Sequence, residues 1–340
     1  MWAAIGLFGA VSYVWWVYNF EVLTLRESEL SSGTEEKQVL GDPGTEKERI
    51  QRLKEKIGQI QDHNREVAGE KLELQEGKEG LLWFVNDARF RWLLSVYFNG
   101  AYILAFVSWF QTMFTDPGPL PGVESLSNDD LKYLTKCRHC RGSKPMRTHH
   151  CRYCERCHLK MDHHCLWLVG CVGFRNQKVY FLFLTYTIIC AGTIILTTPL
   201  ILYKCPLPSF IFSWDFVSHW ANIRAHLLIA LFYIECLIIF TGCALLWAHH
   251  WRYITMNLTT IELLDYVSKV EAGLIPAPTT FQPNLSPFSL GSERANFEQV
   301  FGHSPWLWWL PFFSTPGTGH SFPVSSPTSP LLNKNRKRCV

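Results

Sequence analysis

The sequence has little net charge of either sign. Its 340 residues include 32 Lys and Arg against 29 Asp and Glu, a formal charge of +3. Proteins that bind nucleic acid usually need a basic excess to contact phosphates, so the composition predicts no nucleic-acid partner. Lys and Arg are also absent before Arg26. A cleaved signal peptide normally begins with a basic region, which favours a retained transmembrane helix over a signal peptide for the apolar stretch from Trp2 to Phe20.

Apolar and aromatic residues are abundant, with 14 Trp and 23 Phe, and they gather in long runs. Four stretches have the length that crosses a hydrocarbon core of about 30 Å, namely residues 1–25, 91–114, 178–203 and 224–248. Residues 115–177 lack such a run and are expected to fold in water at the membrane face. The sequence therefore predicts an all-α polytopic membrane protein with four transmembrane helices and a loop-rich domain between the second and third. Four spans place both termini on the same side as that domain.

The segments outside the spans have patterns of their own. Residues 26–90 are polar and partly helical, and some apolar residues recur at steps of three and four, which fits a short coiled coil or a solvated amphipathic helix. Residues 249–315 follow the fourth span. Residues 316–340 are rich in Ser, Pro and Gly and are predicted to be disordered. A basic cluster beside Cys339 suits attraction to anionic lipid and acylation of that thiol, or simply a solvated tail.

Cysteines and histidines are concentrated in one stretch of the predicted loop-rich domain. Seven of the twelve cysteines lie between Cys137 and Cys171, within 35 residues. Thiolates and imidazoles at Cys-x2-Cys spacing bind tetrahedral Zn²⁺. Two closed sites need eight ligands, and the stretch offers more, because it also contains His139, His149, His150, His158, His163 and His164. Clustered thiols at metal spacing indicate a reducing compartment, so we expect this domain to face the cytosol.

The surplus of ligands points to a reactive group at Asp162-His163-His164-Cys165. A nucleophilic cysteine must lie outside the metal shell and needs a base, which an adjacent histidine can supply and an aspartate can orient. Four successive residues cannot all point at one centre, so one histidine can bind metal while the other faces the thiol. A purely structural double zinc finger, with Cys165 as another ligand, is the alternative. A thiol at the cytosolic mouth of a helix bundle could meet both a fatty chain in lipid and a polar leaving group in water.

The spacing of these residues resembles the DHHC protein S-acyltransferases, or palmitoyltransferases. The pattern is Cys137-x2-Cys140-x9-His150-Cys151-x2-Cys154-x2-Cys157-x4-Asp162-His163-His164-Cys165-x-Trp167-x3-Cys171-x-Gly173-x2-Asn176. Three other motifs are similar to those of the family: Asp116-Pro117-Gly118 to DPG, Thr259-Thr260-Ile261-Glu262 to TTxE, and Asn296 in Asn-Phe-Glu-Gln-Val-Phe-Gly to PaCCT. The resemblance extends from about Trp92 to Pro323.

The resemblance implies a role for each of these residues. One structural Zn²⁺ would be bound by Cys137, Cys140, His150 and Cys157, and the second by Cys151, Cys154, His164 and Cys171. Cys165 would be the nucleophile, with His163 as its base and Asp162 orienting His163. By the same resemblance, Thr260 of TTxE would lie near Asp162 and Asn296 would brace this region. Trp167 would lie at the entrance of an acyl cavity between the spans.

The resemblance also implies an activity and its partners. The enzyme would be a protein-cysteine S-palmitoyltransferase that takes a long-chain acyl group from acyl-CoA, with palmitoyl-CoA expected, and passes it to cytosolic cysteines of membrane-associated proteins. It would be a multi-pass protein of the endomembrane system, in the Golgi, ER or plasma membrane, and could form a homo-oligomer. A catalytically weak zinc-finger scaffold is the competing hypothesis. A zinc hydrolase would need an open metal position, and the count of eight ligands for two ions leaves none.

Two features leave the rate and the acyl preference open. Leu166 stands where the family usually has Pro, and Val169-Gly170 stand where Asn is usual, so a fixed φ and a locally bonding side chain are lost beside the nucleophile. In the third span, the small residues Cys190, Ala191 and Gly192 fit either a deep acyl cavity or close helix packing.

Overall fold

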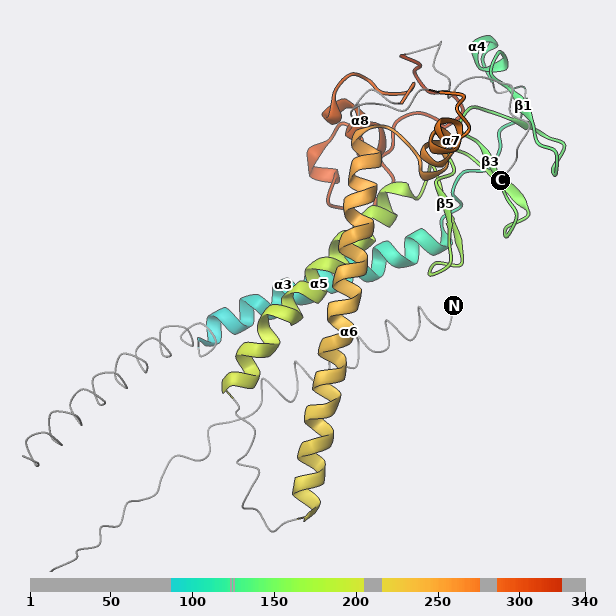
Figure 1. Ribbon diagram of the computed structural model, residues 1–340. Coiled ribbons are helices and arrows are strands. Elements are labelled where there is room, and N and C mark those ends of the chain that lie inside the picture. Colours follow the sequence, from blue (N-terminus) through green and yellow to red (C-terminus); the bar gives the residue numbers. More distant parts are fainter. Residues whose placement is uncertain (1–86, 123, 125, 205–215, 276–285, 326–340) are drawn as a thin grey trace, which may run out of the picture. The chain divides into compact units, whose positions relative to one another are not determined.

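The structure, a computed structural model, describes residues 87–122, 124, 126–204, 216–275 and 286–325 (Figure 1). Within these ranges three helices are long and apolar enough to cross a membrane: α3 (Ala88–Phe114), α5 (Gln177–Lys204) and α6 (Phe216–Thr255). They match the second, third and fourth predicted spans. The first predicted span and most of the polar segment at 26–90 lie outside the described residues.

Helix α6 is longer than the apolar run that predicts it. The run ends near residue 248, but the helix continues to Thr255. Its last turn is held because Ile254 is almost fully buried and the Asn296 side-chain amide donates to the Thr255 carbonyl, 2.8 Å away. A helix end leaves such carbonyls without a partner, so this bond stabilises the final turn. Asn257 then adopts a left-handed φ of 52°, which ends the helix.

The spanning helices pack through apolar side chains along much of their length. One cluster joins α3, α5 and α6 through residues that include Phe98, Cys190 and Cys236. Gly192 lies where α5 meets α6, since a Cβ at that position would come within 3.3 Å of the Phe240 ring. At Gly192, therefore, the small residue serves close helix packing, the second of the two interpretations that the sequence allows.

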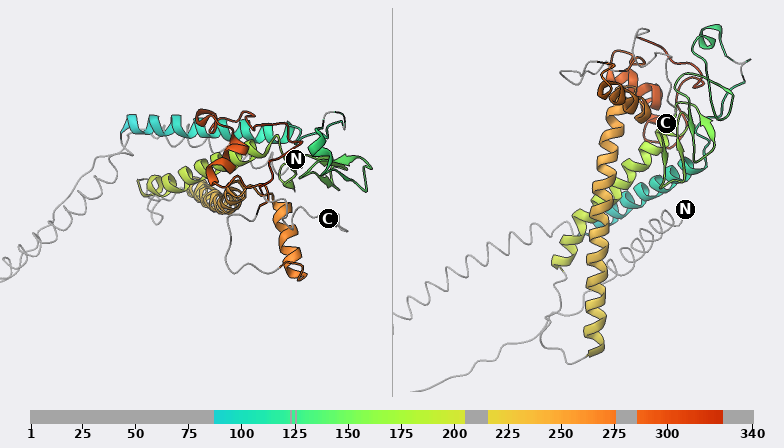
Figure 2. Two further views of the ribbon diagram at one scale, coloured as in Figure 1. Left: turned by 90° about the horizontal axis from the view of Figure 1, so that it is seen from above. Right: turned by 45° about the vertical axis from the view of Figure 1, so that its right-hand side comes forward.

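The cysteine-rich domain between α3 and α5 consists of three two-stranded antiparallel hairpins, seen at the upper right of Figure 1 and again in Figure 2. Their strands are β1 (Thr135–Lys136) with β2 (Ser143–Lys144), β3 (His149–Cys151) with β4 (Arg156–His158), and β5 (His163–Cys165) with β6 (Gly170–Val172). The short helix α4 (Asn128–Leu131) precedes them.

The DPG turn and Asn176 dock this domain onto the spanning helices. Asp116 accepts the backbone N–H of Gly118, and the Gly118 carbonyl in turn accepts the backbone N–H of Leu159. Gly118 has a φ of 136°, a conformation that glycine adopts most readily. The fully buried Asn176 amide donates to the carbonyl of Thr112 near the end of α3. These contacts fix how the hairpins stand at the end of the spans.

The segments after α6 form α7 (Thr260–Glu271), α8 (Glu293–Phe301) and the 3₁₀ turn η3 (Pro305–Leu307). Buried side chains of α8, such as Val300 and Phe301, pack against Phe181 of α5 and Ile254 of α6. The sequence predicts disorder from residue 316, whereas the described residues up to 325 make tertiary contacts. Phe322 lies against the Phe174 and Phe288 rings, and Ser325 bonds the Pro287 carbonyl, so apolar contacts outweigh the polar composition there.

Candidate functional site

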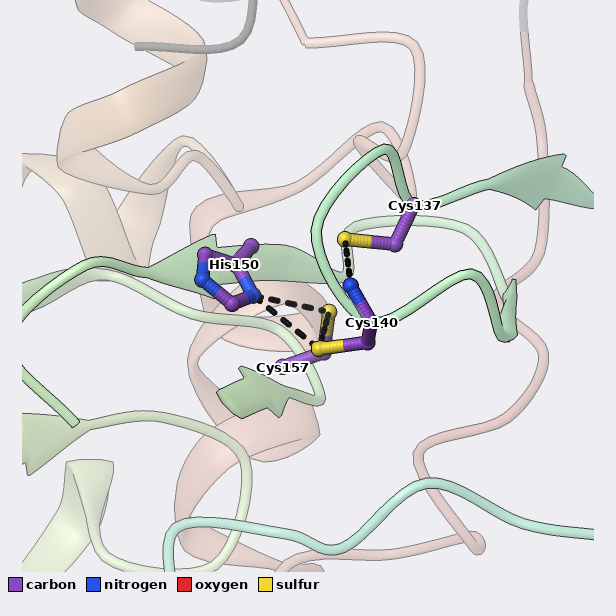
Figure 3. A group of neighbouring side chains, drawn as sticks. All are labelled: Cys137, Cys140, His150 and Cys157. Carbon is purple, nitrogen blue, oxygen red and sulfur yellow. Dashed lines mark hydrogen bonds between the residues drawn. The ribbon is translucent and has the colours of Figure 1, made fainter. Parts of the chain in front are cut away.

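The first Cys/His group contains Cys137, Cys140, His150 and Cys157, whose ligand atoms all lie within 4.8 Å of one another (Figure 3). His150 and Cys157 come from paired positions of β3 and β4. Around a tetrahedral Zn²⁺, two thiolates would lie about 3.8 Å apart and a thiolate and an imidazole nitrogen about 3.6 Å apart. The structure has 3.8 Å between the sulfurs of Cys140 and Cys157, and 3.1 and 3.8 Å from these sulfurs to His150 Nδ1.

The second group contains Cys151, Cys154, His164 and Cys171. The sulfur atoms of the three cysteines lie 3.4 to 3.6 Å from His164 Nδ1, and the sulfurs of Cys154 and Cys171 are 3.6 Å apart. The Cys154 backbone N–H also donates to the Cys151 sulfur, as it would to a metal-bound thiolate. Both groups therefore have the ligands and the spacing to hold a tetrahedral metal ion, and the structure brings together the same residues that the family resemblance implies.

Electrostatics also favour a cation in each group. Burial raises the pKa of the Cys157 and Cys171 thiols, and the other thiols of each group raise it further. Thiols this close cannot all ionise unless a positive charge lies among them. Zn²⁺ supplies such a charge and prefers the three-sulfur, one-nitrogen donor set that both groups offer.

The β5 strand directs the side chains of the DHHC tetrad to two opposite faces. Successive side chains of a strand point to opposite faces, so His163 and Cys165 share one face while His164 lies on the other. His164 is paired with Cys171 across the hairpin, and both belong to the second metal group. One histidine is thus directed to the metal group and its neighbour to the side of the thiol, and His164 is the metal-facing one, as the family resemblance implies.

Asp162 and His163 form a buried ion pair beside this thiol. His163 Nδ1 lies 2.6 Å from Asp162 Oδ2, and the aspartate side chain is only 1% exposed. Burial alone would lower the pKa of His163, but the bonds to Asp162 and to the Cys165 thiol outweigh it and raise that pKa to about 10. Burial alone would raise the pKa of Asp162, but the bond from His163 holds it well below its usual range. The carboxylate therefore fixes a cationic imidazole on the strand face that also bears Cys165.

The TTxE motif supplies the other partners of Asp162. Thr259 is the N-cap of α7 and forms a reciprocal capping box with Glu262. Thr260 therefore occupies the first turn, where backbone N–H groups have no partner inside the helix. Its N–H donates to Asp162 Oδ1 at 2.8 Å and its hydroxyl to Oδ2 at 2.9 Å. The helix N-terminus thus stabilises the aspartate charge and fixes the carboxylate.

Arg147, which the sequence analysis did not single out, holds this helix end against the cysteine-rich domain. Its guanidinium makes a two-point contact with Glu262, with both N–O distances 2.8 Å, and also donates to the side chain and carbonyl of Asn257. The Arg147 side chain is fully buried and lies over the rings of Phe288 and Phe322. The Glu of TTxE is therefore an anchor for α7, and Thr260 is the part of the motif that reaches the site.

His250 is the second residue that the sequence analysis missed. It lies near the end of α6 with 7% of its side chain exposed, and its Nδ1 is 4.0 Å from Asp162 Oδ2. Its ring is 5.5 Å from the His163 ring and meets Tyr180 edge-on. Together with Asp162 and His163 it forms a third close group of possible metal ligands. The sequence offered one signal for His250, since an ionisable side chain at the end of a predicted span is a candidate functional residue.

The remaining predicted residues lie around this centre. Asn296 bonds Thr255, Ser289 and Leu290, so it braces the end of α6 and the loop before α8. Trp167 and Leu166, in the β5–β6 turn, are exposed. Val169, in the same turn, has a φ of 50°, a strained conformation for a β-branched residue that Asn adopts more easily. The departure from the family pattern therefore falls on a strained backbone position.

Cys165 itself is 93% buried, since only 7% of it is exposed, and it packs with Leu168, Tyr180 and Phe183 next to apolar side chains of α3 and α6. A thiol, an imidazole and a carboxylate thus lie together beside apolar helices, and β5 also carries His164, a member of the second Cys/His group. This combination is typical of membrane proteins whose thiol lies close to lipid, and three of the described helices are long and apolar enough to cross a membrane.

Comparison with known proteins gives the family. The family model described as DHHC palmitoyltransferase matches residues 131–267. The chain is 37% identical over 208 residues to "Palmitoyltransferase ZDHHC15A" of Danio rerio and 36% identical over 194 residues to "Palmitoyltransferase ZDHHC20" of Homo sapiens. These alignments cover 60% and 57% of this chain, and 57% and 47% of the relatives, so the chain spans about half of their length.

A plant relative is matched over more of its length. The chain is 32% identical over 262 residues to "Probable protein S-acyltransferase 12" of Arabidopsis thaliana, an alignment that covers 70% of this chain and 81% of the relative. The chain belongs to the DHHC palmitoyltransferase family.

Proposed function

We propose that this protein is a protein-cysteine S-palmitoyltransferase that acylates membrane-associated proteins through an S-acyl intermediate on Cys165. The observation that carries the proposal is the buried contact between Asp162 and His163 on the strand face that also bears Cys165. Family membership supports the same chemistry. The Asp162 contact directs His163 Nδ1 toward the carboxylate, so the other ring nitrogen is the one available to the thiol.

In the first step, the proton of the Cys165 thiol passes to His163, and the sulfur attacks the thioester carbonyl of an acyl-CoA. A new carbon–sulfur bond forms to Cys165, the bond to the CoA sulfur breaks, and CoA leaves as a thiol with the proton that His163 held. In the second step, His163 takes the proton of a substrate cysteine, whose sulfur attacks the acyl-enzyme and releases Cys165. Asp162 keeps the imidazole in one orientation through both proton transfers, and Thr260 keeps Asp162 in place.

Two Zn²⁺ ions, one in each Cys/His group, would act as structural ions. Each group supplies four protein ligands, which leaves no open position for water or substrate, so the metal would hold the hairpins rather than take part in the reaction. Because His164 belongs to the second metal group and directly precedes Cys165 in β5, the second ion would hold the backbone from which Cys165 projects.

The acyl chain is proposed to lie between the spanning helices. The neighbours of Cys165 are apolar side chains from α3, α5 and α6, among them Trp109, Leu184 and Trp247, which suit a hydrocarbon chain. Trp167, exposed in the turn after Cys165, is proposed as the entrance residue. The substrates would be cytosolic cysteines of membrane-associated proteins, and the enzyme would be a four-span protein of the endomembrane system with residues 115–177 in the cytosol.

The test is self-acylation of the purified, zinc-loaded chain with acyl-CoAs of graded length. We expect a hydroxylamine-labile adduct on Cys165, a maximum near the palmitoyl chain, and no adduct on the Cys165→Ser variant. Zinc content measured on both proteins is the control for folding. A zinc-loaded protein that forms no adduct would support a scaffold role instead, and an adduct that persists in Cys165→Ser would show that the nucleophile is another residue.

A further inference from the structure

An exposed aromatic segment follows α8. Residues 305–313 read Pro-Trp-Leu-Trp-Trp-Leu-Pro-Phe-Phe, and Trp306 and Trp309 are 89% and 63% exposed. The other large exposed side chains of this aromatic segment are Leu307, Leu310, Phe312 and Phe313. Contiguous apolar surface of this kind on a protein usually marks a place where a partner or a membrane covers it.

The backbone of the aromatic segment is tied to α5. The Lys178 ammonium donates to the carbonyls of Leu307 and Phe312, at 2.6 and 3.0 Å, and the Tyr186 hydroxyl donates to the carbonyl of Trp309. Lys178 is 1% exposed, so the segment covers it. Because these carbonyls are turned to the helix, the side chains of Trp306, Trp309 and Phe312 are left on the outer side, whereas Trp308 packs inward against Phe297.

The positions of these contacts give the depth of the segment. Lys178 and Tyr186 belong to the candidate span Gln177–Leu200, and eight residues separate them, which is about 12 Å along a helix. The headgroup zone occupies roughly the outer 5–8 Å on each side of a bilayer. The aromatic segment, the red ribbon after α8 in Figure 1, therefore lies along the first turns of this candidate span, the part that would pass from the headgroups into the hydrocarbon.

The composition and hydrogen bonding of the segment suit lipid. Between Glu298 and Lys334 the sequence contains no Asp, Glu, Lys or Arg. Irregular backbone is tolerated in lipid only where its polar groups are satisfied. Here four backbone N–H groups, those of Leu307, Trp308, Leu310 and Phe312, donate to nearby carbonyls, and the two prolines have none to satisfy. The Trp308 indole, the half-buried one, donates to the Gly302 carbonyl.

A second exposed apolar group lies at the same level of α5. Leu168, in the β5–β6 turn, packs with Tyr180 and Phe183, while its neighbours Leu166 and Trp167 are exposed. The turn and the aromatic segment thus contact α5 within the same stretch, residues 178–186. Trp at this level is typical of residues that lie at a membrane interface.

We infer that the aromatic segment is a membrane-interface anchor whose partner is the lipid bilayer itself. Trp306, Trp309, Phe312 and Phe313 enter the boundary between headgroups and acyl chains, while Lys178 and Tyr186 hold the backbone behind them. The anchor sets the height at which α8 and the Asn296 bracing contacts stand above the hydrocarbon. It does not depend on the chemistry at Cys165.

Photocrosslinking of the full chain tests the inference. Trp306 is replaced by p-benzoylphenylalanine, a change at a side chain too exposed to disturb the fold, and the protein is reconstituted in phosphatidylcholine vesicles. Irradiation should give a covalent phospholipid adduct at position 306. The matched control places the same group at Leu131, which is exposed on α4 at the end of the cysteine-rich domain away from the spanning helices (Figures 1 and 2) and should give no lipid adduct.

A second measurement reports the depth. The fluorescence of Trp306 and Trp309 is obtained as the difference between wild type and a Trp306→Phe, Trp309→Phe double variant. In vesicles of brominated phosphatidylcholine, bromines near the headgroup end of the acyl chain should quench this difference more than bromines near the bilayer centre. A crosslinked dimer at position 306 would assign the surface to a second copy of the chain. Absence of any lipid adduct, or equal adducts at 306 and 131, would also overturn the inference.

Discussion

Replacing Thr260 by Val removes one hydrogen bond from the aspartate and leaves nearly the same shape. The lost bond joins the Thr260 hydroxyl to Asp162 Oδ2 over 2.9 Å, whereas the backbone N–H at 2.8 Å from Oδ1 remains. A hydrogen bond to a charged group contributes about 1.5–3 kcal/mol. If His163 needs a fixed carboxylate in the transition state, the whole of that free energy is lost there, and the rate falls by about 10- to 150-fold.

The assay is the single-turnover rate at which Cys165 becomes acylated at saturating palmitoyl-CoA. Thr260→Ser is the matched control, because it retains the hydroxyl and should keep most of the rate. Zinc content and the thermal unfolding midpoint should be the same in both variants, since the capping box of α7 belongs to Thr259 and Glu262. A normal rate in Thr260→Val, or an equal loss in both variants, would refute the view that the hydroxyl positions Asp162.

Four other outcomes are expected. Cys165→Ser should retain two zinc ions per chain, whereas chelation of the zinc should unfold the hairpins; loss of one full equivalent in the variant would make Cys165 a ligand. Val169→Asn should raise the free energy of unfolding by about 1 kcal/mol, because Asn tolerates the left-handed φ of 50°, and Val169→Ala should do so less. His250→Gln should lower the acylation rate and leave the KM for acyl-CoA unchanged; a change confined to thermal stability would make His250 merely structural. Burial alone would raise the pKa of Glu262, but the charge of Arg147 outweighs it and lowers that pKa. The ionised Glu262 therefore stabilises the fold above the ordinary pKa of 4.5, and this stabilisation is lost as the pH falls below 4.5. The stability difference between wild type and Glu262→Gln, about 3 kcal/mol at pH 7, should therefore shrink below pH 4.5 in thermal unfolding.

Local spacing explains why so much of the site could be predicted from sequence. The two groups of metal ligands and the Asp162–Cys165 tetrad lie within 35 residues, and the three described spans are continuous apolar runs. Residue spacing alone left open which of His163 and His164 faces the metal, and only the family resemblance assigned them. The β5–β6 hairpin, which gives the physical reason, has three residues per strand and no hydrophobic alternation to reveal it.

The contacts that support the site were beyond the reach of the sequence patterns. Arg147 meets Glu262 across 115 residues, and Lys178 meets Leu307 across 129. A single basic residue has no periodicity, and which carboxylate or carbonyl it meets is decided only by the packing of α7 and α8. His250 was missed for the same reason, because its neighbour Asp162 lies just before β5, far from His250 in the sequence.

The two-residue repeat of β5 makes the order of the tetrad as important as its composition. A shift of the β5–β6 register by one residue would exchange the two faces of the strand. Cys165 and His163 would then turn toward the metal ligands, and His164 would turn toward the apolar helices. Insertion of a single residue between His163 and Cys165 would thus place these two side chains on opposite faces of the strand, although every functional group would still be present in the chain.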